Sequence, residues 1–202
     1  MRVPAILSLL LAACGAPESG SAPDRAAEPA VLLDGESLFQ LEMTLEDQAG
    51  RPFELAQLRG HPVLVAFFYS RCDTMCPTIL SDLRRTEAGL TPEARQALRV
   101  VLVSFDGERD TVARLGTVAA ERSIELDRWT LVRGEDAEVR TLAATLGMTY
   151  RRTDDGEYAH AALTTLLDGE GRVVRTVEGT GADEAPMRAA IERLVAGASP
   201  PG

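Results

Sequence analysis

Two short apolar runs constrain the fold of this chain more than any other feature. Residues 62–69 read PVLVAFFY and residues 99–105 read RVVLVSF, and such runs are typical of strands that are buried on both faces. Between them, Ile79, Leu80 and Leu83 have helical spacing. A strand, a helix and a second strand in this order predict a right-handed parallel crossover, and hence an α/β protein.

The remaining patterns extend this unit to a complete domain. We predict further strands at residues 41–45, 52–55, 129–132, 161–167 and 172–178, and helices that begin at residues 76 and 92 or span 111–122, 136–146 and 184–195. Turn-forming residues at 47–50 and 168–171 join two pairs of strands into hairpins. This order predicts a thioredoxin-like α/β fold with an N-terminal β-hairpin, in which helices flank both faces of a central mixed sheet.

The amino terminus reads MRVPAILSLLLAAC, in which a short apolar segment ends in small residues and Cys14. Such a segment is an export signal and not a membrane span, and its final residues resemble a bacterial lipoprotein signal. We expect residues 1–13 to be a signal peptide, Cys14 to be lipidated, residues 14–36 to continue as a flexible tether, residues 37–197 to form the folded domain, and residues 198–202 to be a disordered tail. A plain secretory signal with a chance cysteine is the alternative.

Composition excludes several classes of function. The 202 residues carry a net charge of -10, whereas nucleic-acid binding requires a basic surface, so we expect no nucleic-acid partner. Every basic side chain is Arg, which excludes lysine Schiff-base chemistry and the phosphate-loop lysine. No internal apolar run reaches the roughly 20 residues of a membrane span.

Cys72 and Cys76 carry the chemistry that we expect of this chain. They follow the strand at 62–69 where the next helix begins, at the sheet edge where α/β proteins usually bind ligands. Two thiols four positions apart share one helical face, with Cβ atoms about 5–6 Å apart. The N–H groups of the first helical turn, and nearby Arg71, favour the thiolate form. A thiolate pair serves either as nucleophiles or as ligands of a soft metal.

Other interpretations of the pair compete with a metal site. A structural disulfide would close a very short loop and stabilise the fold little. Thioredoxin-type redox motifs have two residues between their cysteines, whereas this motif has three. Thiol–disulfide exchange stays open nevertheless, with Cys72 attacking and Cys76 resolving the mixed disulfide. A thiol peroxidase would need an upstream Pro-x-x-x-Thr/Ser-x-x-Cys context, which neither cysteine has.

A third ligand would complete a soft-metal site, and the chain has two histidines. His160 precedes the strand predicted at 161–167, and in a thioredoxin-like sheet the loop before that strand faces the cysteine helix, where thioredoxins usually carry a cis-proline. We therefore predict that His160 meets Cys72 and Cys76 through the fold. His61 lies in a turn before a strand and is expected to be a surface residue. Two thiolates and an imidazole suit copper or zinc, and not magnesium or calcium.

These motifs together resemble those of the SCO/SenC family. The similarity runs from about residue 39 to residue 195 and includes the segments 47–55, 58–65 and 103–111, the Cys-x-x-x-Cys-Pro motif at 72–77, and His160. The chain departs from the family pattern at Gly107, where the family usually has Pro. It also has Ala159 and Ala161 where the family often has Asp and Ser around the ligand histidine.

The resemblance implies a copper metallochaperone, which binds Cu(I) or Cu(II) through Cys72, Cys76 and His160 and turns over no substrate. Its copper would go to the dinuclear copper centre of cytochrome c oxidase, so the copper-site subunit of that oxidase would be its partner. Other copper chaperones and thioredoxin-like reductases are further partners that the family admits. The competing function is an extracytoplasmic thiol–disulfide oxidoreductase that reduces copper-site cysteines of a partner through Cys72 and Cys76. Either way, we expect an extracytoplasmic bacterial lipoprotein, anchored to a membrane through Cys14.

Overall fold

The computed structural model describes residues 36–72 and 75–198. The strands are β1 (Leu45–Asp47), β2 (Pro52–Phe53), β3 (Val63–Phe68), β4 (Arg99–Ser104), β5 (Trp129–Arg133), β6 (Tyr150–Arg152), β7 (Tyr158–His160), β8 (Leu163–Leu167) and β9 (Val173–Glu178). The α-helices are α1 (Met75–Ala88), α2 (Pro92–Ala97), α3 (Val112–Glu121), α4 (Asp136–Thr145) and α5 (Ala185–Ala198), and the 3-10 helices are η1 (Leu38–Gln40) and η2 (Leu55–Leu58).

Seven of the strands form one mixed sheet in the order β2-β1-β5-β4-β3-β8-β9. β3, β4 and β5 run parallel at its centre, and the outer strands pair antiparallel with their neighbours. Every residue of β3 is buried, because β4 and β8 flank it and helices cover the sheet. The apolar run at 62–69 therefore forms the expected central strand, and α1 and α2 make the crossover from β3 to β4.

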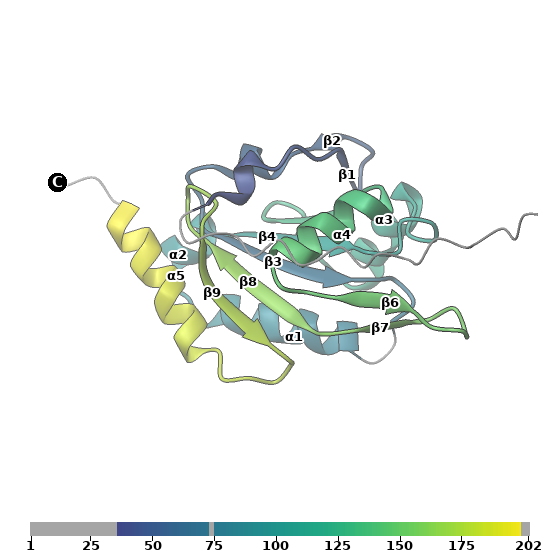
Figure 1. Ribbon diagram of the computed structural model, residues 1–202. Coiled ribbons are helices and arrows are strands. Elements are labelled where there is room, and N and C mark those ends of the chain that lie inside the picture. The colour runs from purple at the N-terminus through teal and green to yellow at the C-terminus, as the bar shows by residue number, and fades with distance from the viewer. Residues whose placement is uncertain (1–35, 73–74, 199–202) are drawn as a thin grey trace, which may run out of the picture.

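Helices cover both faces of this sheet, with α1 on one face and α4 on the other (Figure 1). α5 packs beside α1 and α2. α3 ends next to α1. Arg84 of α1 donates a hydrogen bond across 3.2 Å to the carbonyl of Ser123, which follows α3. The core is mostly aliphatic, and Leu102, Leu115 and Leu142 are almost completely buried. The arrangement is thioredoxin-like, as the order of elements predicted.

Two helix ends follow directly from local sequence. The Thr91 side chain accepts a hydrogen bond from the Ala94 N–H, and Pro92 occupies the first turn of α2, the arrangement that an N-cap threonine followed by proline favours. Gly147 follows Leu146, the C-cap of α4, and has a φ of +80°, a backbone conformation that glycine adopts without steric cost. Both signals predicted these boundaries.

The N-terminal hairpin forms, but its first strand begins later than predicted. β1 covers Leu45–Asp47 and pairs with β2 and β5. Residues 41–44 are not part of a strand, and the Thr44 N–H donates instead to the Glu138 side chain, across 3.0 Å. The prediction of a strand over 41–44 was wrong because alternating polarity does not by itself provide a pairing partner.

A third hairpin, made of β6 and β7, was not predicted. Its two strands form a separate two-stranded sheet, closed by a turn in which the Thr153 N–H donates to the Glu157 carbonyl across 2.8 Å. β8 begins only at Leu163, so His160 ends β7 and does not lie in a loop. The Asp155-Gly156 pair between two aromatic-containing segments is the hairpin signal that the sequence carried.

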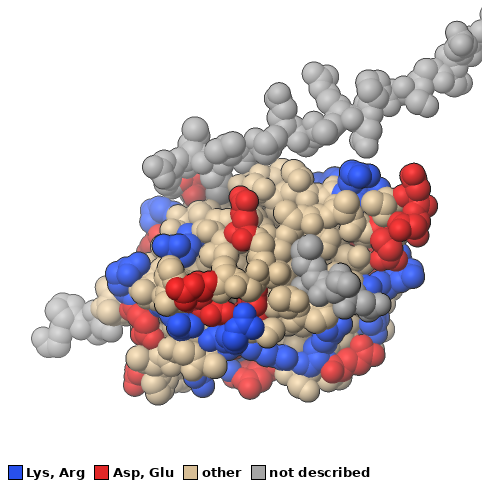
Figure 2. Space-filling model, turned by 90° about the horizontal axis from the view of Figure 1, so that it is seen from below, with Lys and Arg blue, Asp and Glu red and all other residues tan. Residues whose placement is uncertain are grey.

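Several predictions concern residues outside the described part of the chain. The signal peptide, Cys14, nearly all of the tether and most of the tail lie there. Within residues 36–72 and 75–198, no helix is long and apolar enough to cross a membrane. On the face shown in Figure 2, Arg side chains are interspersed with Asp and Glu side chains.

Candidate metal centre

The candidate site lies where the central strand β3 ends. The Cys72 N–H donates to the Tyr69 carbonyl across 3.2 Å, which turns the chain from the strand toward α1. Cys76 lies in the first turn of α1. Both cysteines are thiols and not halves of a disulfide, and each is only 4% exposed. The pair therefore occupies the carboxyl edge of a parallel strand, as predicted.

The two thiols have different surroundings. The backbone N–H of Cys76 donates to Sγ of Cys72 across 3.3 Å, so the positive end of α1 favours negative charge on the Cys72 sulfur. The Cys76 thiol donates to the Tyr69 carbonyl across 3.7 Å. Its hydrogen bond to Cys72 and its burial raise the pKa of Cys76 far above that of an ordinary thiol. The expectation of a thiolate is therefore wrong for Cys76.

Arg71 does not act as expected either. Its side chain is largely exposed, and its guanidinium lies 3.6 Å from the carboxylate of Glu157. That carboxylate offsets the positive charge that we expected Arg71 to direct at the thiols.

The short strand β7 brings His160 to the cysteines. His160 pairs in register with Tyr150, and its side chain is hydrogen-bonded to Cys72. Partial burial acts to lower the pKa of His160, but the hydrogen bonds to Cys72 and to the Ala161 carbonyl outweigh it, and the pKa is raised. The strand β7 therefore brings His160 to Cys72, the first cysteine of the pair.

The ring of His160 has a defined orientation. Its Nδ1 lies 3.0 Å from the Ala161 carbonyl oxygen. Because a carbonyl only accepts hydrogen bonds, Nδ1 carries the proton of this bond, and in the neutral imidazole the lone pair that a metal needs is on Nε2. The acceptor belongs to the backbone, so the Ala that stands at residue 161 in place of the family's usual Ser does not remove it.

Two aromatic rings contact the imidazole, and two more pack beside them. The ring centroids of Phe105 and Tyr69 lie 4.9 Å and 5.8 Å from that of His160. Phe105 also packs against Tyr158 and stacks on Tyr150, at centroid distances of 5.1 Å and 4.7 Å. This cluster includes all three tyrosines of the chain, and its packing restricts the imidazole further. We did not predict it, since each ring comes from a different segment.

The donor set fits a soft or borderline metal ion. Two sulfurs and one imidazole nitrogen are typical ligands of copper and zinc, and a backbone carbonyl that holds Nδ1–H is a usual partner of metal-binding histidines. Among the residues that the structure describes, no three His, Cys, Asp or Glu side chains are already arranged as a metal site. Cys72, Cys76 and His160 would therefore have to move closer together on binding.

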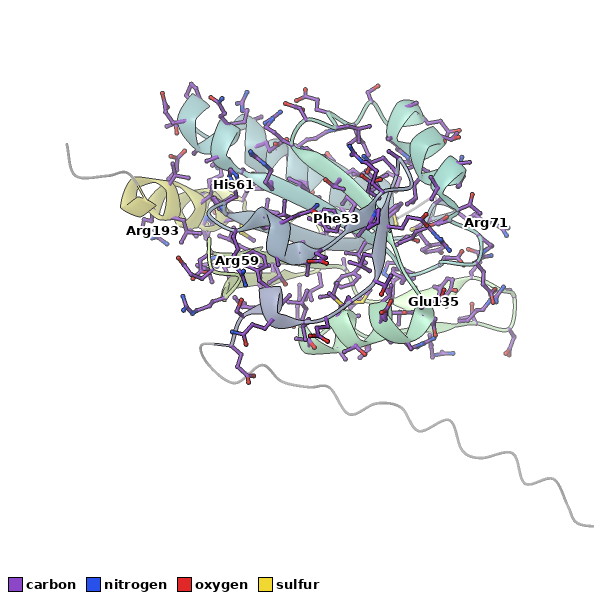
Figure 3. The ribbon with its side chains drawn as sticks, turned by 90° about the horizontal axis from the view of Figure 1, so that it is seen from above. Phe53, Arg59, His61, Arg71, Glu135 and Arg193 are labelled. Atoms are coloured by element: carbon purple, nitrogen blue, oxygen red, sulfur yellow. The ribbon has the colours of Figure 1, made fainter. Side chains whose placement is uncertain are left out.

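His61 lies far from this centre. It is half-buried, and its Nδ1 donates to the Ala97 carbonyl across 2.9 Å. Figure 3 shows it at the opposite end of the molecule from Arg71, the neighbour of Cys72. His61 thus has a structural role at the start of β3, which is more buried than the surface position that we expected.

Close packing explains why residue 107 is a glycine in this chain. A Cβ atom at this position would lie 2.8 Å from the carbonyl oxygen of Gly134, closer than carbon and oxygen approach without a shift of the backbone. The loops that follow β4 and β5 therefore pack together through two glycines. This contact accounts for the departure from the family's usual Pro.

Comparisons with known proteins agree on one family. A family model described as SCO1/SenC matches residues 33–196. A Stutzerimonas stutzeri protein whose name proposes copper binding is 29% identical over 160 residues, which cover 74% of this chain and 77% of that protein. A SCO1/SenC family lipoprotein from Bacillus anthracis has a TM-score of 0.69 at 19% identity, covering 78% of this chain and 95% of that one. Yeast Sco1 with copper bound has a TM-score of 0.65 at 23% identity, covering 80% and 90%. At these identities the two structures show a shared fold.

Proposed function

The chain belongs to the SCO1/SenC family, and we propose that Cys72, Cys76 and His160 bind a copper ion that the protein delivers to the dinuclear copper centre of cytochrome c oxidase. The observation that carries this proposal is the placement of His160 beside the cysteine turn: its ring centroid lies 5.8 Å from that of Tyr69, three residues before Cys72, and the Cys72 side chain raises its pKa. Sulfur ligands suit Cu(I), and the added imidazole suits Cu(II). The copper in yeast Sco1 and the name of the Stutzerimonas stutzeri relative support copper over zinc.

Copper binding and release would involve a proton at Cys76. Burial and the hydrogen bond to Cys72 keep this thiol protonated, and a cysteine must lose its proton to bind a metal. Loading would therefore release that proton, and transfer of copper to a recipient would return it. A site of this kind holds copper reversibly, as a carrier requires.

The position at which the chain enters the domain fits a membrane tether. At this entry the Leu38 N–H donates to the Gly171 carbonyl across 2.9 Å, beside the β8–β9 turn. That turn adjoins the start of β3, because Leu167 pairs with Val63. The thiols follow the far end of β3, about 20 Å away for a strand of this length. We propose that Cys14 is lipidated and that the metal centre faces away from the membrane, outside the cytoplasm.

Thiol–disulfide exchange is the second candidate, and the inequivalence of the two thiols favours it. Cys72 receives an N–H hydrogen bond from the start of α1, whereas Cys76 is a protonated thiol behind it. Cys72 thiolate would attack a partner disulfide and form a mixed disulfide, releasing one partner thiolate. Cys76 would then lose its proton and displace the second partner sulfur, leaving a Cys72–Cys76 disulfide and a reduced partner.

Copper binding by variants tests the leading proposal. We expect wild-type protein to bind one equivalent of copper, and C72S and C76S to lose tight binding. H160A should bind Cu(II) at least about tenfold more weakly, with a changed absorption spectrum, whereas the matched variant H61A should behave as wild type. Unchanged Cu(II) affinity and spectrum in H160A would remove His160 from the site and overturn the proposal.

The same variants separate the second function from the first. If the apoprotein acts as a reductase, C72S should abolish reduction of a disulfide-bonded recipient while H160A leaves it largely intact. Reduction by a protein that ignores stoichiometric copper would favour exchange as the main function. For the anchor, C14S should move the protein from the membrane fraction to the soluble fraction, and an unchanged distribution would contradict lipid attachment.

A further inference from the structure

The β6–β7 hairpin, which carries His160, is not a strand of the main sheet. Within the described residues, β6 and β7 pair only with each other, and Figure 1 shows the hairpin extending beyond the end of the seven-stranded sheet. Side-chain contacts therefore have to hold the hairpin against the domain. The position of His160 relative to Cys72 depends on these contacts.

Glu157 provides polar contacts between the hairpin and residues 69–72, which we call the cysteine loop. The Tyr69 hydroxyl donates to Oε2 of Glu157 across 3.1 Å, and the guanidinium of Arg71 lies 3.6 Å from Oε1. Tyr69 and Arg71 belong to the turn that leads into Cys72. The Arg109 guanidinium, from the loop after β4, lies 3.9 Å from the same oxygen. One carboxylate thus links the hairpin to both loops that border the site.

The remaining contacts of the hairpin are both polar and aromatic. The Tyr150 hydroxyl donates to Asp136 across 3.3 Å, and Arg152 pairs with Glu108 across 3.1 Å, but neither partner belongs to the turn that leads into Cys72. Tyr150 and Tyr158 pack on Phe105, and the Tyr158 hydroxyl donates to Asp106 across 3.3 Å. Ring packing resists separation of the hairpin from the domain but restrains sliding less than directional hydrogen bonds do. Glu157 directly precedes β7 and lies three positions before His160, a separation of about 10 Å along an extended chain.

The Glu157 contacts contribute little to the stability of the domain. The Glu157 side chain is 37% exposed, and exposed ion pairs contribute only about 0–1 kcal/mol to stability. A ligand that must be held near two sulfurs, however, is sensitive to displacements much smaller than those that unfold a domain. Loss of these contacts should therefore alter the metal centre more than the fold.

We propose that Glu157 is a positioning residue, which fixes the β6–β7 hairpin to the cysteine loop and so holds His160 against Cys72. The inference deepens the proposed copper function and rests on it for the metal-bound state, while its structural part applies to the protein without metal. Because the imidazole matters most to Cu(II), removal of Glu157 should weaken Cu(II) binding more than Cu(I) binding.

Three full-length variants test this role. E157A removes all three contacts, and E157Q keeps an acceptor for the Tyr69 hydroxyl but loses the charge that attracts Arg71 and Arg109. D154A removes an equal charge from an exposed position on the same turn and is the matched control. Two quantities are measured: amide hydrogen exchange of β6 and β7 in the apoprotein, relative to β3 and β4, and the affinities for Cu(II) and Cu(I) with the nitrogen coupling in the Cu(II) electron paramagnetic resonance spectrum.

We expect E157A to speed hairpin exchange while β3 and β4 stay protected, and to weaken Cu(II) binding about tenfold with reduced nitrogen coupling. E157Q should lie between E157A and wild type, and D154A should match wild type. Hairpin exchange in E157A that equals that of D154A would overturn the proposal, as would an unchanged Cu(II) affinity and spectrum in a protein that binds copper. If wild type binds no copper, the copper function fails, and the exchange data alone decide the role of Glu157.

Discussion

The backbone N–H of Cys76 donates a hydrogen bond to Sγ of Cys72 across 3.3 Å, so the two cysteines of the motif are not equivalent. The start of α1 favours negative charge on the first sulfur, while the second is a buried thiol with a raised pKa. The same inequivalence serves both proposed functions. The Cys72 sulfur would be the first to contact copper or a partner disulfide. After losing its proton, Cys76 would bind the same copper ion or resolve the mixed disulfide.

Single-thiol variants should therefore differ in reactivity. At neutral pH, we expect Cys72 in C76S to react with iodoacetamide at least about tenfold faster than Cys76 in C72S, because Cys72 keeps the N–H hydrogen bond from the start of α1, whereas Cys76 keeps the burial that raises its pKa, and the thiolate is the reactive form. The rate for Cys76 should rise steeply only at alkaline pH. Mass spectrometry of quenched samples measures both rates, with the urea-unfolded variants as a control in which the difference should vanish. Equal rates in the folded proteins would refute the assignment.

Phe105 should affect both stability and the metal centre. It is 2% exposed and touches the His160 ring, so F105L should lower the free energy of unfolding by about 1–2 kcal/mol and loosen the imidazole. F53L removes a similarly buried ring from β2 (Figure 3) and should cost comparable stability. Only F105L should change the Cu(II) absorption spectrum. A changed spectrum in F53L as well would point to a general loss of structure.

Two glycines with almost the same backbone conformation should respond differently to alanine. Gly171 and Gly179 have φ values of +83° and +82°, so G171A and G179A each carry a backbone cost of about 1–2 kcal/mol. A Cβ at residue 171 would also lie 2.6 Å from the ring of Phe39, whereas nothing lies within 4 Å at residue 179. Urea denaturation should show G171A to be less stable than G179A by a further 1–3 kcal/mol, roughly the cost of overpacking. Equal losses would mean that the Phe39 ring moves aside freely.

Asp47 should contribute a pH-dependent part of the stability. Burial alone would raise the pKa of Asp47, but hydrogen bonds from Arg51 and Ala49 and the Arg51 charge outweigh it and hold the pKa below 3.8. A lowered folded-state pKa stabilises the fold above the unfolded-state value, and this stabilisation disappears as the pH falls through the folded-state pKa. D47N should therefore cost about 1–3 kcal/mol at neutral pH, and its deficit relative to wild type should shrink below about pH 4.

Urea denaturation at a series of pH values measures this deficit, with D154N as the control for an exposed carboxylate on a turn. A deficit in D47N that stays constant from neutral to strongly acidic pH would show that the carboxylate charge does not stabilise the β1–β2 turn.

Predictions from sequence succeeded where a segment has one dominant environment. β3 and β4 lie within one residue of the predicted ends, because a strand buried on both faces must be apolar throughout. The start of α2 was predicted because Thr91 and Pro92 act within one turn. Residues 41–44 and the β6–β7 hairpin were mispredicted, since whether a short polar segment forms a strand depends on the partner that the fold places beside it.

The sequence by itself determined the chemistry that is available at the site: two thiols one helical turn apart, at the junction of a buried strand and a helix, and a histidine near the start of a later strand. These features follow from local spacing and polarity. Only the tertiary structure decided that His160 contacts Cys72, that Cys76 is the protonated thiol, and that Glu157 rather than the thiols receives Arg71. All three results depend on burial and on contacts between distant segments. Burial and long-range contacts are not encoded in any single stretch of the chain.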